Sequence, residues 1–181
     1  MTVADSEALP RAALIAALAL AVGAIGAVLA VAALHHPRPQ PVVVAAMPAP
    51  GAQDQTCRAL MAALPERLGD YQRAALAAPA PAGTAAWRTG GGGEPVVLRC
   101  GLDRPAGFVV GSPTLVVGSV QWFDEADRAD RAASSTWYTV DRPVYVVLTL
   151  PAGSGPTPIQ QLSEVIEQTV AAVPIDPAPP R

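Results

Sequence analysis

The 181-residue chain contains no lysine, only two histidines and two cysteines, and few aromatic residues. Without lysine, a Ser-Lys dyad and a Schiff base are excluded. Both histidines, His35 and His36, lie beside a long apolar stretch, which excludes a Ser-His-Asp triad inside a folded domain. A structural zinc site needs four ligands at short spacings, and the cysteines and histidines do not supply them. We therefore expect no catalytic residues, no metal site and no cofactor, and we predict that the protein is not an enzyme.

Charge is also sparse, with 12 arginines against 15 acidic residues and a net charge of −3. A nucleic-acid surface requires clustered basic residues, whereas these arginines are scattered and mostly lie near Asp or Glu. We expect no nucleic-acid partner. The densest acidic run, 124–131, interleaves with arginine and lacks the spacing of a calcium loop, so we interpret it as a solvated connection between two strands.

The most distinctive segment runs from Ala12 to Leu34 without a charged residue or a proline. As a helix it would be about 34 Å long, enough to cross a hydrocarbon core of about 30 Å. Residues 12–34 are therefore predicted to be a transmembrane helix or uncleaved signal anchor in the lipid bilayer, preceded by a cytoplasmic N-terminus, 1–11. A cleaved signal peptide ending near Ala30–Ala32, which would release a secreted protein, is the alternative.

Proline-rich segments mark both ends of the remaining chain. Residues 35–53 contain five prolines, and we predict a semi-rigid linker there. Residues 174–181 are predicted to be a disordered tail. Between them, residues 54–173 have the usual size of one domain with a single core.

The hydrophobic pattern of 54–173 predicts helices at both ends and strands between them. A short helix carries Cys57, Leu60 and Leu64, a second short helix covers Asp70–Ala78, and a loop covers 79–94. Strands are expected at 96–100, 108–110, 114–123, 134–140 and 144–150, before an amphipathic helix with Thr157 as N-cap that Pro174 ends. This order indicates an α+β fold: a small antiparallel sheet of four to five strands with the two main helices packed on one face.

The two cysteines, Cys57 and Cys100, have one obvious pairing in an exported domain. A disulfide between them would close a loop of about 43 residues and contribute about 4 kcal/mol in the chain-entropy model. The alternative, Cys100 as a nucleophile, lacks a nearby histidine base. Because disulfides persist in oxidising compartments, the bridge also predicts that the domain lies outside the cytoplasm.

A possible binding surface rests on five residues. Trp87, Trp122 and Trp137 are candidate contacts, and the competing interpretation is that they form the core of a domain poor in aromatics. The tripeptide Asp-Arg-Pro occurs twice, with Arg104 and Arg142 at its centre. The two arginines either form an anion site or simply mark turns that enter strands.

Several segments together resemble the actinobacterial family named domain of unknown function 3515. They are Cys57 with Leu60, Leu64-Pro65 with Leu68, Ala86-Trp87, Pro95–Gly101, the strand around Trp122, Arg142-Pro143 and the final helix. The segment Leu-Arg-Cys-Gly is the most specific of these, and the resemblance covers about residues 54–173. Four glycines after Trp87 lengthen a connection that is expected to be shorter. The resemblance implies an actinobacterial membrane or secreted protein, without an assigned activity.

These observations favour a membrane-anchored extracytoplasmic domain that binds an envelope protein or a cell-wall component without catalysis. One alternative is a structural or assembly subunit that acts through its membrane helix. The other is a carboxylate-dependent cell-wall hydrolase, which needs two facing carboxylates about 5 to 10 Å apart. Its candidates are Glu94, Asp124, Glu125 and Asp127.

Overall fold

The computed structural model describes residues 11–34, 40–125 and 134–180. The chain divides into two compact units, Met1–Pro39 and Gln40–Arg181, and each is described by itself. Most of the predicted N-terminus, 1–11, and most of the acidic run lie outside the described residues.

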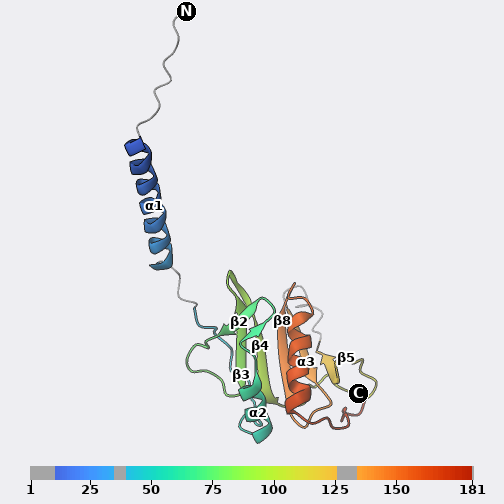
Figure 1. The fold of residues 1–181 in the computed structure, drawn as a ribbon. Coiled ribbons are helices and arrows are strands. Elements are labelled where there is room, and N and C mark those ends of the chain that lie inside the picture. Colours follow the sequence, from blue (N-terminus) through green and yellow to red (C-terminus); the bar gives the residue numbers. More distant parts are fainter. Residues whose placement is uncertain (1–10, 35–39, 126–133, 181) are drawn as a thin grey trace, which may run out of the picture. The chain divides into compact units, whose positions relative to one another are not determined.

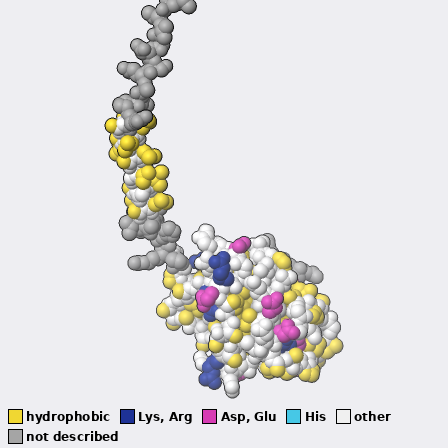
Figure 2. Space-filling model, viewed as in Figure 1, with side chains coloured by type: hydrophobic (Ala, Val, Ile, Leu, Met, Phe, Trp, Pro, Cys, Tyr) yellow, Lys and Arg dark blue, Asp and Glu magenta, His cyan; other side chains and the backbone are white. Residues whose placement is uncertain are grey.

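The first unit contains the predicted apolar helix. Helix α1 (Arg11–Leu34) includes a stretch, Ala12–Val31, that is long and apolar enough to cross a membrane. Every side chain of this stretch is exposed, and Figure 2 shows hydrophobic side chains along the helix. A membrane anchor and a signal sequence both fit these properties.

The second unit is an α+β domain built on one antiparallel sheet (Figure 1). The strands are β1 (Arg67–Leu68), β2 (Tyr71–Ala74), β3 (Thr84–Thr89), β4 (Gly92–Leu102), β5 (Leu115–Val117), β6 (Val120–Asp124), β7 (Ser134–Thr139) and β8 (Tyr145–Pro151). Their order in the sheet is β1-β2-β3-β4-β8-β7-β6-β5. Two four-stranded meanders, β1 to β4 and β5 to β8, therefore lie side by side and join through the central pair β4–β8.

The predicted α+β class is confirmed, but the expected number of strands is wrong, because the sheet has eight. Two of the missing strands lie where we expected a helix and a loop. Within 70–78 the chain forms β2, whose pairing with β3 outweighs the helical propensity of the alanines in this segment. Within 79–94 it forms β3, and Gly90-Gly91 makes the two-residue turn into β4, with Thr89 opposite Gly92.

Two helices, α2 (Gln55–Ala63) and α3 (Thr157–Thr169), pack on one face of the sheet. The apolar side of each is buried, as the helical spacing predicts: Cys57 and Leu60 in α2, and Ile159, Leu162 and Ile166 in α3. Thr157 is the first helical residue, and Pro156 occupies the N-cap position. The helix ends at Thr169, four residues before the expected end, where the chain becomes extended.

Among the described residues of this unit, the opposite face is covered by irregular segments in three small apolar clusters. Val42 packs on Ala86 and Val97, Ala49 packs beside Leu102, Tyr138 and Val147, and Phe108 contacts Phe123. Residues 40–53, predicted as linker, thus belong to the compact unit. The backbone of Val42 also hydrogen-bonds with Ala75 and Ala77 at 2.8 Å.

The predicted tail also makes backbone contacts with the domain. Ala178 accepts a hydrogen bond from the Val110 amide at 2.9 Å and donates one to the Phe108 carbonyl at 3.0 Å. These bonds form a short parallel bridge between Val109 and Ala178. In the structure the Pro-rich segment therefore lies against the β4–β5 connection, in contrast to the expected disorder.

Gly101 marks the closest approach of the N-terminal segment to the sheet. Its φ of +86° and the register shift between Cys100 and Leu102 define a bulge in β4. A Cβ atom there would lie 2.2 Å from the carbonyl carbon of Gly51, whose amide donates to the Gly101 carbonyl at 2.9 Å. Only glycine satisfies both the backbone conformation and the close contact.

Candidate functional site

Cys57 and Cys100 form the predicted disulfide, with their Cα atoms 5.6 Å apart. The bridge joins α2 to the central strand β4 inside the main core, where both cysteines are fully buried. This arrangement leaves no thiol for nucleophilic chemistry. A buried bridge of this kind is typical of proteins that fold in an oxidising compartment.

The tryptophans of the predicted binding surface belong to the core or its margin. Trp87 and Trp122 have 0% of their surface exposed, so their assignment to a binding surface is wrong and the core interpretation holds. Their indole N–H groups are satisfied internally, by the Pro65 carbonyl at 2.9 Å and the Ser163 hydroxyl at 3.0 Å. Trp137 is only partly buried and borders a depression of about 290 Å³ beside α3.

The two arginines of the Asp-Arg-Pro repeats do not share a site. Arg104 pairs with Asp176 of the C-terminal segment at 3.3 Å. Arg142 is buried and binds the Asp141 carboxylate at 2.9 Å and the Ser119 carbonyl at 3.2 Å. Each guanidinium therefore has its own protein partner, so the predicted joint anion site is not formed by the described residues.

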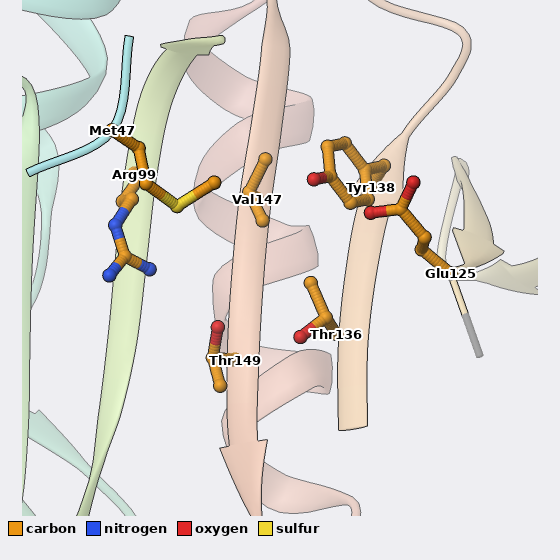
Figure 3. Close-up of a pocket in the computed structure, with 7 residues that line it drawn as sticks. All are labelled: Met47, Arg99, Glu125, Thr136, Tyr138, Val147 and Thr149. Carbon is orange, nitrogen blue, oxygen red and sulfur yellow. The ribbon is translucent and has the colours of Figure 1, made fainter. Parts of the chain in front are cut away.

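The structure instead presents a groove of about 540 Å³ on the face opposite α2 and α3 (Figure 3), lined by Met47, Arg99, Glu125, Thr136, Tyr138, Val147 and Thr149. Strand register explains why these side chains meet. Arg99, Val147 and Tyr138 form one row across β4, β8 and β7, and Val97, Thr149 and Thr136 form the next row. Residues of both rows project to the same face, because side chains two positions apart along a strand share a face.

A second depression of about 280 Å³ adjoins the groove, and Arg99 and Thr149 line both. Its other border includes Glu94 of β4 and the apolar residues Val43 and Val44. The two depressions together form one surface, which we call the Arg99 groove. Glu94 lines one of its two parts and Glu125 the other.

Arg99 is the cation among the lining residues of this surface. Among the residues that the structure describes, no hydrogen bond or ion pair to this side chain is found, and its Nε atom is buried without a partner. Burial lowers the pKa of Arg99, and the nearby Tyr138 opposes that shift. The groove therefore contains a half-buried positive charge whose solvation is incomplete.

The charges of Arg99 and Glu125 act in opposite directions on the pKa of Tyr138. Burial raises the pKa of Tyr138 to about 12, a hydrogen bond to the Glu125 carboxylate and the charge of that carboxylate add to the shift, and Arg99 opposes it. The hydroxyl thus stays protonated at neutral pH and can donate a hydrogen bond. Together with Thr136 and Thr149, it gives the groove three hydroxyl groups between a cation and a carboxylate.

Replacing Tyr138 with phenylalanine is expected to make the free energy of unfolding fall less steeply as the pH rises from about 10 to about 12. An unfolded tyrosine ionises near pH 10, whereas folded Tyr138 retains its proton until about pH 12. In this window the unfolded state binds fewer protons than the folded state, so the free energy of unfolding of the wild type falls as pH rises. The stabilisation that comes from the raised pKa of Tyr138 is fully present below about pH 10. Urea midpoints at pH 9 to 11.5 measure this slope.

The control for this measurement is Tyr71→Phe, because Tyr71 lies on β2, on the far side of β3 and β4 from Tyr138. Tyr71→Phe should keep the loss of stability with pH that Tyr138→Phe removes. Equal slopes for the wild type and Tyr138→Phe would contradict the assignment of Tyr138 as a buried group coupled to Glu125.

Of the groove residues, sequence reasoning singled out Glu94 and Glu125 but not Arg99, Tyr138 or Thr149, although one signal for Arg99 was present. Arg99 is the only charged residue among the apolar residues 96–100, and it lies within the Leu-Arg-Cys-Gly segment. Glu94 and Glu125, two candidates of the hydrolase hypothesis, line different parts of the groove. Within the described ranges, no group of three or more metal-ligating side chains is found.

Comparisons with known proteins place the chain by family. No curated protein and no solved structure matches it. The model of the family described as "Protein of unknown function (DUF3515)" matches residues 18–175, which include most of the apolar helix, both cysteines, the Arg99 groove and α3. The match confirms the resemblance seen in the sequence, and the chain belongs to this family.

Proposed function

We propose that the protein is a membrane-anchored module outside the cytoplasm of an actinobacterial cell, where it binds an envelope protein or a cell-wall component without catalysis. The apolar helix α1 supports the anchor, and the Cys57–Cys100 disulfide supports the oxidising location. The observation that carries the binding function is the Arg99 groove, a polar concave surface on the face of the sheet opposite α2 and α3.

The composition of this groove favours binding. Small-molecule sites usually occupy about 300 to 1,000 Å³ and contain a few polar groups in a largely apolar wall. The Arg99 groove has this size, with apolar walls from Met47 and Val147 and polar groups from Arg99, Tyr138 and two threonines.

A photo-reactive residue placed in the groove tests this function. Thr149 is replaced with p-benzoylphenylalanine in the full-length chain, and the protein is irradiated in its native membranes. We expect covalent adducts that the same substitution at Gln168, an exposed position on α3, does not form. Digestion with a protease or a glycan hydrolase then shows whether the adduct is a protein or a cell-wall fragment.

Two outcomes would contradict the proposal. Absent adducts at Thr149, or equal adducts at Thr149 and Gln168, would mean that the groove has no specific occupant. Replacing residues 12–34 with an unrelated anchor tests the alternative of an assembly subunit. Under our proposal the adducts at Thr149 persist in this variant, whereas a subunit that works through its helix would lose them.

A further inference from the structure

We infer that the Arg99 groove recognises its ligand through one anionic group, best a carboxylate, which the Arg99 guanidinium holds beside the hydroxyl of Thr149. This inference rests on the proposed binding function and names the chemistry of the ligand. It depends on three features: an arginine without a protein partner, the donors around it, and the carboxylates in the two parts of the groove.

The first feature is the incomplete solvation of Arg99. Its Nε atom is buried without a hydrogen-bond partner, and no ion pair within the described ranges reaches its guanidinium. A buried donor without a partner destabilises a protein, and a charged donor does so more strongly. The Nε atom of Arg142 is also buried without a partner, but Arg104 and Arg142 each form an ion pair with a carboxylate of this chain, which Arg99 does not. A ligand anion would give Arg99 the partner that the fold provides for the other two.

The second feature is the position of the neighbouring hydroxyls. Val147 lies between Arg99 and Tyr138 in the same row, so the valine forms an apolar floor with a cation on one side and a hydroxyl on the other (Figure 3). Thr149 is diagonal to Arg99 on the adjacent strand, within reach of a group bound to the guanidinium. The fork of N–H groups in arginine matches the two oxygens of a carboxylate.

The third feature limits the charge of the ligand. Glu125 lines the part of the groove with Tyr138, and Glu94 lines the part beyond Thr149. These carboxylates repel a chain of repeated anionic groups and favour hydroxyl or ammonium groups on either side of a single anion. A phosphate monoester, with a charge between −1.5 and −2 near pH 7, is less favourable here than a carboxylate. The best ligand is therefore a hydroxylated or zwitterionic monocarboxylate.

The test uses three sugars that differ only at one carbon: glucuronate, glucose 6-phosphate and glucose. The full-length protein is held in a polyoxyethylene detergent, which contains neither sugar nor phosphate, and the Nε–H resonance of Arg99 is followed by NMR. We expect glucuronate to shift this resonance with a millimolar Kd and glucose to bind at least tenfold more weakly. The Kd of glucose 6-phosphate should lie between those of glucuronate and glucose. If glucose 6-phosphate binds more tightly than glucuronate, the anionic group is reassigned to phosphate.

Variants assign the effect to Arg99. In Arg99→Gln, binding of glucuronate, followed through the Thr149 amide, should weaken at least tenfold. Arg67→Gln is the matched control, because Arg67 is an exposed arginine on the edge strand β1 and its loss removes the same charge. If Arg99→Gln fails to fold, the comparison of the three sugars on the wild type still decides.

Glucose binding as tightly as glucuronate, unchanged binding in Arg99→Gln, or no shift with any of the three sugars at 50 mM or with acetate would overturn the inference. If such a result is found together with adducts at Thr149 in membranes, the proposal of an anionic ligand is wrong and the proposed binding function is retained. If no adducts form at Thr149, both the binding function and the anionic ligand are contradicted.

Discussion

Trp122→Ala is expected to destabilise the domain by about 3 to 5 kcal/mol, the usual range for removing a buried tryptophan. The indole of Trp122 is fully buried between the sheet and α3, and its N–H donates to the Ser163 hydroxyl, which in turn donates to the Ile159 carbonyl at 2.7 Å. Truncation leaves a cavity in the main core and removes the acceptor role of Ser163. The shift of the urea midpoint of the full-length protein in detergent measures the loss.

The matched control is Trp137→Ala. Trp137 lies on β7, is partly exposed and donates to the nearby Ser135 hydroxyl at 2.9 Å, so its truncation should destabilise the domain by less than half as much. The loss of stability in Trp122→Phe should lie between the losses in Trp122→Ala and Trp137→Ala, because phenylalanine keeps most of the packing and loses the hydrogen bond. Equal losses at Trp122 and Trp137 would show that Trp122 does not occupy the core position described above.

Removing the disulfide in Cys57→Ala/Cys100→Ala is expected to lower the free energy of unfolding by about 4 kcal/mol. The two cysteines are separated by 43 positions, and closing a loop of this length reduces the entropy of the unfolded chain by an amount worth about 4 kcal/mol. Both side chains lie in the main core, so their truncation adds a small packing loss. Denaturation of the variant, compared with the wild type with and without reductant, measures the effect.

The wild type with reductant should approach the midpoint of the double variant, and neither protein should change further when more reductant is added. A single variant, Cys57→Ala, separates the bridge from the packing loss, because it removes the whole bridge and only one side chain. The prediction would fail if reductant left the wild-type midpoint unchanged while alkylation showed that both thiols had been released.

Elements with strong local patterns were predictable. The alternation along β8 places Val146, Leu148 and Leu150 on the helix-covered face, and the sequence of α3 buries Ile159, Leu162 and Ile166 as its spacing indicates. The cysteine pairing followed from there being only two cysteines. For β8 and α3 the hydrophobic periodicity within the segment is sufficient, and two cysteines allow only one intramolecular pairing.

Elements governed by distant partners were not predictable. Tyr71–Ala74 has no strong strand pattern and becomes a strand because β3 lies beside it, and β3 in turn was hidden by alanines and a glycine-rich turn. The segment around Val42 reads as a proline-rich linker, yet Val42 packs against Ala86 and Val97 from remote strands. These contacts depend on the final sheet order, which the sequence pattern does not contain.

The groove was missed for a related reason. Arg99, Tyr138 and Thr149 come from three strands whose adjacency requires the β4–β8 pairing between the two meanders. Sequence reasoning instead selected tryptophans and repeated Asp-Arg-Pro motifs, which are conspicuous along the chain but satisfied within the fold. A single arginine inside an apolar strand was the signal for this surface, because Arg99 is the charged residue among the apolar residues 96–100.

The disulfide also determines how the domain would carry a mechanical load. Arg99 is adjacent to Cys100, which is bonded to Cys57, and from there the chain leads back through Gln40 towards the apolar helix. Under the proposed function, a force between a ligand bound at Arg99 and a membrane that holds the apolar helix would follow this short covalent route. Residues 58–98, which include β1, β2 and β3, lie outside the route, so their unfolding would not lengthen the tether. The bridge would fix the maximum reach of the domain even when half of its sheet is pulled apart.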